Sequence, residues 1–106
     1  MSSLRAVLDL AASGAGDIDV SSAPDGSTTW SVRGTTFAVL SPDGAAASFL
    51  LDPIVAGAAA RTPDVTRSDR GPGWVEIRPS VVDGHAADRA GAWFVSGHRR
   101  LTGPGA

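Results

Sequence analysis

WSVRGTTFAVLSPDGAAASFLL, residues 30–51, is the stretch that decides the fold class. Bulky and polar residues alternate along 28–33 and again along 35–40, a period of two that is typical of half-buried strands. Gly34 and the SPDG tetrapeptide at 41–44 indicate tight turns, because glycine adopts positive φ and proline presets its own φ. The stretch therefore predicts an antiparallel meander whose strands are 28–33, 35–40 and 47–51.

One face of this meander is apolar and must be covered. The residues expected on that face are Trp30, Val32, Phe37, Val39, Phe49 and Leu51. So much apolar surface is unfavourable in water, and the flanking helices are the only segments that could cover it. Trp93 and Phe94, from the last predicted helix, are expected to pack against it, so that Trp30, Phe37, Phe49 and Trp93 line the core.

The rest of the chain alternates between helical patterns and strand patterns. The predicted elements are a helix at 4–12 capped by Ser3, a strand at 17–22, a short helix after Asp52 and Pro53, an exposed loop at 62–73, a strand at 74–78, and a helix from Asp83 to about Arg100. This order predicts an α+β fold, an antiparallel sheet of about five strands with the N-terminal, middle and C-terminal helices packed on one face. We expect a single domain over residues 1–106 with a disordered tail at 102–106.

Composition excludes several classes of function. The 106 residues include no cysteine, which excludes disulfides and thiol catalysis. The N-terminus does not resemble a signal peptide and no apolar run is long enough to span a membrane, so we expect a cytoplasmic protein without a membrane partner. The net charge is −2, and all nine basic residues are arginines. Because phosphate neutralisation dominates DNA affinity, DNA binding would need arginines gathered in one place.

Several local patterns, in this order and spacing, resemble the MmcQ/YjbR family of small bacterial proteins. The segment W-x-V-R-G-x-x-F-A occupies 30–38, a strand runs into an acidic residue and a helix at 49–53, and a W-V-x-I strand occupies 74–77. Ala92-Trp93 and His98-Arg99-Arg100-Leu101 complete the resemblance, which covers about Leu4 to Leu101. Thr35 stands where members commonly have a lysine.

The resemblance implies a YjbR/CyaY-like fold, related to a double-wing motif, and a DNA-binding protein without enzymatic activity. The arginines that could contact phosphates are Arg33 at a hairpin tip, Arg78 at a strand end, and Arg99 with Arg100 at the end of the last helix. The alternative for Arg99 and Arg100 is that they only complement the helix dipole.

A second hypothesis is a protein-interaction or self-associating module. Trp74 has the opposite parity to Val75 and Ile77, so it is the aromatic residue expected to be exposed and to form such a surface. We expect no cofactor and no metal, because His85 and His98 fall on different sides of one helix and no His-Glu-x-x-His spacing occurs. No nucleophile elbow or phosphate-binding loop is present either, so no enzymatic activity is expected.

Overall fold

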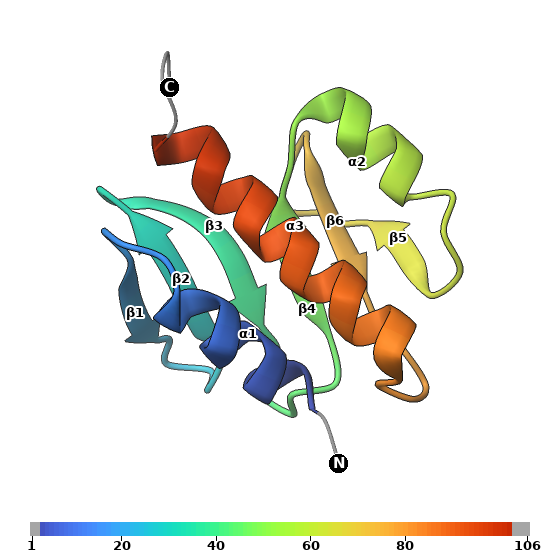
Figure 1. The fold of residues 1–106 in the computed structure, drawn as a ribbon, viewed down its shortest axis with the longest axis horizontal. Coiled ribbons are helices and arrows are strands. Elements are labelled where there is room, and N and C mark those ends of the chain that lie inside the picture. Colours follow the sequence, from blue (N-terminus) through green and yellow to red (C-terminus); the bar gives the residue numbers. More distant parts are fainter. Residues whose placement is uncertain (1–2, 103–106) are drawn as a thin grey trace.

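The computed structural model describes residues 3–102, in which three helices pack against an antiparallel sheet of six strands (Figure 1). The strands are β1 (Asp19–Ser22), β2 (Thr28–Val32), β3 (Thr35–Leu40), β4 (Ala47–Leu50), β5 (Val65–Arg67) and β6 (Trp74–Ile77), and the helices are α1 (Leu4–Ser13), α2 (Pro53–Ala59) and α3 (Gly84–Thr102). Their order across the sheet is β1-β2-β3-β4-β6-β5. The predicted α+β class is confirmed.

The sixth strand lies where the sequence predicts only a loop. β5 pairs with β6 through three residues, with Val65 opposite Ile77 and Arg67 opposite Val75. Only Val65 is buried in this strand, so no alternation of apolar residues indicates it in the sequence. The prediction of a loop over all of 62–73 is therefore wrong, and β5 depends on its partner strand for its structure.

A β-bulge between β2 and β3 changes which residues face the helices. Trp30 pairs with Ala38 and Ser31 pairs with Thr36, which leaves Phe37 as an extra residue. As a result Phe37 and Ala38 both lie in the core with no exposed surface. The prediction that Phe37 and Val39 share the inner face is wrong, because the bulge shifts the alternation by one residue.

The core lies between the sheet and the helices, with α3 running diagonally across the strands and α1 beside it (Figure 1). Phe94 of α3 meets Phe37 edge-on at 5.0 Å between ring centroids and Trp30 at 5.8 Å. Trp93 is only partly buried and contacts Phe49 at 6.2 Å. Three of the four rings expected to line the core are therefore fully buried, whereas Trp93 is only partly buried, and Phe94, expected to pack beside it, is fully buried.

Glycine at position 97 allows α3 to lie close to the sheet. A Cβ atom at Gly97 would lie 3.0 Å from the Leu50 carbonyl oxygen and 3.2 Å from Cδ2 of Phe37. The C-terminal half of α3 therefore contacts the start of β3 and the end of β4. This contact positions the basic residues that follow Gly97.

The predicted helix caps are present. Ser3 accepts a hydrogen bond from the Ala6 N–H, and Asp52 and Asp83 accept the equivalent bonds at the starts of α2 and α3. α3 extends to Thr102, so its last turn includes the first residue of the expected disordered tail, and 103–106 lie outside the described residues. Across residues 3–102, no helix combines the length and the apolar character needed to cross a membrane.

Candidate functional site

Arg33 stands at the tip of the β2–β3 hairpin. Its φ is 51° and that of Gly34 is 85°, so both central residues of the turn adopt left-handed conformations. Such a turn matches the twist of the two strands that it joins. The Arg33 side chain is exposed there, directed away from the core.

The C-terminal turns of α3 reach the same end of the molecule. Gly97 lies over Phe37, and the His98 ring centroid lies 5.9 Å from that of Phe37. Figure 1 shows the hairpin tip and the last turn of α3 at one end. Arg99 and Arg100 are exposed in this last turn. We refer to Arg33, Arg99 and Arg100 as the cationic end.

Arg100 is tied to Leu51, the residue that follows β4. Nη1 of Arg100 donates to the Leu51 carbonyl oxygen at 3.2 Å. Among residues 3–102, no carboxylate lies within ion-pair distance of any guanidinium in the cationic end, since the two ion pairs formed involve other arginines. The charges of the cationic end are therefore available to a ligand.

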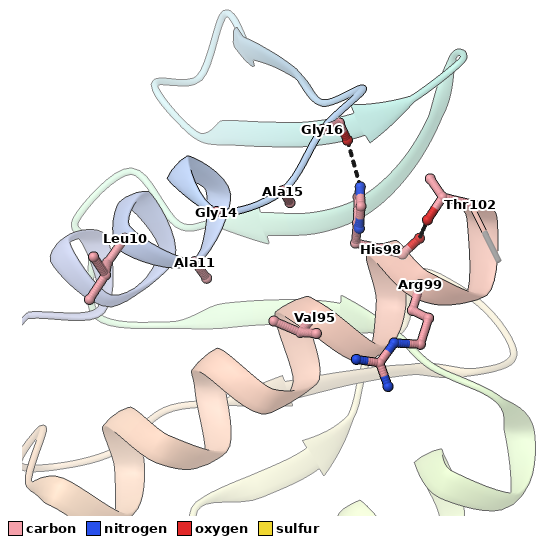
Figure 2. Close-up of a pocket in the computed structure, with 9 residues that line it drawn as sticks. All are labelled: Leu10, Ala11, Gly14, Ala15, Gly16, Val95, His98, Arg99 and Thr102. Carbon is pink, nitrogen blue, oxygen red and sulfur yellow. Dashed lines mark hydrogen bonds between the residues drawn. The ribbon is translucent and has the colours of Figure 1, made fainter.

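A groove between α1 and α3 adjoins the cationic end (Figure 2). Its volume is about 520 Å³, and Leu10 and Val95 give it an apolar surface. Nε2 of His98 lies 2.7 Å from the Gly16 carbonyl oxygen, and Figure 2 shows this bond closing one side of the groove while Arg99 points away from it. Because a carbonyl can only accept, His98 donates from Nε2 and ties α3 to the segment after α1.

Arg78 is not part of the cationic end. It follows β6, whose last residue, Ile77, pairs with Ala47 at the start of β4, whereas α3 contacts the end of β4. Its Nε lies 3.9 Å from a carboxylate oxygen of Glu76. The structure thus places the elements that carry three of the four selected arginines at one end of the molecule, whereas Arg78 follows a strand that ends elsewhere.

Acidic residues also approach the cationic end. Asp19 of β1 pairs with Ser31 near the hairpin, and Asp17 follows Gly16, the residue that His98 contacts. Asp52 follows Leu51, whose carbonyl oxygen Arg100 contacts. These carboxylates reduce the local positive potential. Any polyanion bound here is therefore held mainly by direct contacts with the guanidinium groups.

Trp74 lies on the sheet face opposite the helices, which we call the helix-free face. It is partly exposed, and its cross-strand neighbour Leu50 is partly exposed on the same face. The Arg70 guanidinium carbon lies 5.7 Å from the ring centroid of Trp74. Local sequence patterns do not indicate this cation–π contact, because it depends on how the loop between β5 and β6 folds back.

In the part of the chain that the structure describes, no three His, Cys, Asp or Glu side chains are grouped so that they could hold a metal ion. Comparisons of the chain with models of protein families, with curated proteins and with solved structures find no match. The resemblance to the MmcQ/YjbR family therefore stays a prediction that depends on the residue pattern alone.

Proposed function

We propose that this chain is a small non-enzymatic binding protein that contacts the phosphates of duplex DNA through its cationic end. The observation that supports this is that the β2–β3 hairpin tip, which carries Arg33, and the last turn of α3, which carries Arg99 and Arg100, lie at the same end of the molecule although they are far apart in the sequence (Figure 1). All three side chains are exposed. Guanidinium groups suit phosphate because they present several N–H donors in a planar fork.

The expected binding is weak and sensitive to salt. Three phosphate contacts give a slope of about −2.7 in a plot of log affinity against log salt, which is about a 40-fold loss between 50 and 200 mM. Because DNA phosphates carry no sequence information, the same affinity is expected for duplexes of different sequence. Fluorescence anisotropy with two unrelated labelled duplexes would measure both properties.

Two single substitutions make a matched test, since each removes one exposed arginine charge. Arg99→Ala is expected to reduce the slope to about −1.8, whereas Arg78→Ala, at the other end of the molecule, should leave it unchanged. Arg99→Ala with Arg100→Ala should reduce it further, to about −0.9. Absence of duplex binding at 50 mM salt, or equal effects of the Arg99 and Arg78 changes, would refute the proposal.

A second candidate function is self-association through the helix-free face. The observation that favours it is the pair Leu50 and Trp74, cross-strand neighbours that are both partly exposed with no helix over them. Sedimentation velocity over a range of concentrations should show a dimer that Trp74→Ser weakens. A sedimentation coefficient that stays at the monomer value throughout would exclude this candidate.

A further inference from the structure

The helix-free face contains a polar hollow that is separate from the cationic end. Its volume is about 380 Å³. Its floor is formed by Val39 of β3 and Ser48 of β4, and its walls come from the β1–β2 turn, the β3–β4 turn and the loop after β5. Three carboxylates and one guanidinium line it, from Asp25, Asp69, Glu76 and Arg70. The formal charge of the lining is therefore −2.

Ser48 distinguishes this hollow from an ordinary acidic surface. The residue is only 5% exposed, and it lies between Ala47 and Phe49, which face the core, so its side chain points to the hollow. Among residues 3–102 the fully buried side-chain atom without a hydrogen-bond partner is Nε1 of Trp30, so the Ser48 oxygen, for which no hydrogen bond is found, lies open to the hollow. A hydroxyl in that position is available to a molecule that enters the hollow.

The carboxylate of Asp25, in the β1–β2 turn, lines the same hollow and is held by Ser27. One of its oxygens accepts hydrogen bonds from the Ser27 hydroxyl at 2.6 Å and from the Ser27 N–H at 2.9 Å. These two donors lower the pKa of Asp25 below its usual value, and they leave its other oxygen free. Glu76 lies opposite Ser48 on the neighbouring strand and the same face, and one of its oxygens lies 3.9 Å from Nε of Arg78.

We propose that this hollow binds a small protonated aliphatic amine, which Ser48, Asp25 and Glu76 recognise. An ammonium group has three donors and no acceptor, so it can bind the acceptor-only carboxylates and the lone pairs of the free hydroxyl at once. With Arg78 beside Glu76 counted, the hollow keeps an excess of one negative charge, which favours a cation over a neutral or anionic molecule of the same size. Arg70, which also lines the hollow, lies over the ring of Trp74.

The test uses three four-carbon probes that differ in charge: putrescine, 1,4-butanediol and succinate. Amide chemical shifts of the labelled protein are recorded as each probe is added. Putrescine is expected to saturate with a dissociation constant of about 1 mM and to shift mainly the amides of residues 25–27, 39–48 and 68–76. Butanediol and succinate are expected to cause no saturating shift there.

Two substitutions show whether the hollow itself is responsible. Ser48→Ala removes the free hydroxyl and should weaken putrescine binding about five-fold, and Glu76→Gln should weaken it at least as much. Asp88→Asn, on the exposed side of α3, removes one negative charge elsewhere and should leave the affinity unchanged. Thermal melting establishes that each variant is folded. The proposal fails if Ser48→Ala and Glu76→Gln bind as the parent does, or if putrescine shifts amides near all exposed carboxylates equally.

Discussion

Replacing Gly97 by alanine tests how closely α3 must approach the sheet. Alanine is the better helix former by about 1 kcal/mol, so helix propensity alone predicts a more stable protein. The new Cβ, however, would lie 3.0 Å from the Leu50 carbonyl oxygen and 3.2 Å from Cδ2 of Phe37. The carbonyl belongs to the sheet backbone and cannot move alone, so α3 must shift outward.

The two effects have opposite signs, and their magnitudes decide the outcome. Overpacking of this kind costs about 1–3 kcal/mol, which meets or exceeds the gain in helix propensity. We therefore expect Gly97→Ala to lower the free energy of unfolding by about 0–2 kcal/mol. For a chain of this length each kcal/mol corresponds to about 4 °C in melting temperature.

Gly91 supplies a matched control in the same helix. A Cβ atom there would lie 3.8 Å from Cγ1 of Val7, which is an ordinary van der Waals contact. Gly91→Ala should therefore stabilise the protein by about 0.5–1 kcal/mol. The helix-propensity gain is common to both changes, so the difference in unfolding free energy, about 1–3 kcal/mol, isolates the steric contact at position 97.

Urea denaturation of both variants would measure this difference, with equal m-values showing that the denatured states are comparable. Duplex binding gives a second readout, because an outward shift of α3 moves Arg99 and Arg100 relative to Arg33. If Gly97→Ala stabilised the protein as much as Gly91→Ala does, the close approach of α3 to the sheet would be refuted.

Three further predictions concern turns and caps. Gly73→Ala should lower the free energy of unfolding by about 2–4 kcal/mol in urea denaturation, because φ is +83° there and a Cβ would lie 2.6 Å from the Leu51 carbonyl oxygen. The hydrogen bond from the Ser41 hydroxyl is the main reason why the pKa of Asp43 lies below its ordinary value of 3.8. The charged carboxylate therefore stabilises the folded protein above about pH 4, and this stabilisation is lost as the pH falls through the lowered pKa of the folded state. Melting temperatures across acidic pH should accordingly fall less steeply for Asp43→Asn than for the parent. Asp83→Ala removes the N-cap hydrogen bond of α3 and should lower the free energy of unfolding by about 1 kcal/mol, measured by urea denaturation.

Local sequence patterns predicted most of the fold because most elements carry their own signal. The caps at Ser3, Asp52 and Asp83 and the alternation along β2 and β4 indicated where helices and strands begin. What the patterns could not show depends on contacts between elements. β5 shows no alternation of apolar and polar residues in its sequence. Its structure depends on pairing with β6 and on the burial of Val65.

The bulge at Phe37 shows the same limit at the level of a single residue. Strict alternation places Phe37 with Val39, but the pairing of β2 with β3 leaves Phe37 unpaired and turns Ala38 inward. No local property of TTFAVL indicates the bulge, which lies where Phe37 packs against Phe94 of α3. Val39 consequently moves to the helix-free face, where it forms part of the floor of the polar hollow.

The candidate sites could be predicted only in part, for a similar reason. The arginines were recognisable by type and by their position at turns and helix ends, but only the crossing of α3 over β3 shows that Arg33 and Arg99 share an end while Arg78 does not. The hollow has no sequence motif at all. Its lining comes from three turns that are distant in the sequence and from a strand residue, Ser48, that resembles any exposed serine.

The separation of the two surfaces makes the two proposals independent. Arg33 and Arg99 lie at the end where α3 terminates, whereas Ser48 and Asp25 lie on the helix-free face near the β1–β2 and β3–β4 turns. Arg99→Ala should therefore change duplex binding without changing putrescine affinity, and Ser48→Ala should do the reverse. Substitutions at distant, independent sites do not alter each other's effects. If either substitution changed both the duplex affinity and the putrescine affinity, a single polar surface would account for both kinds of binding.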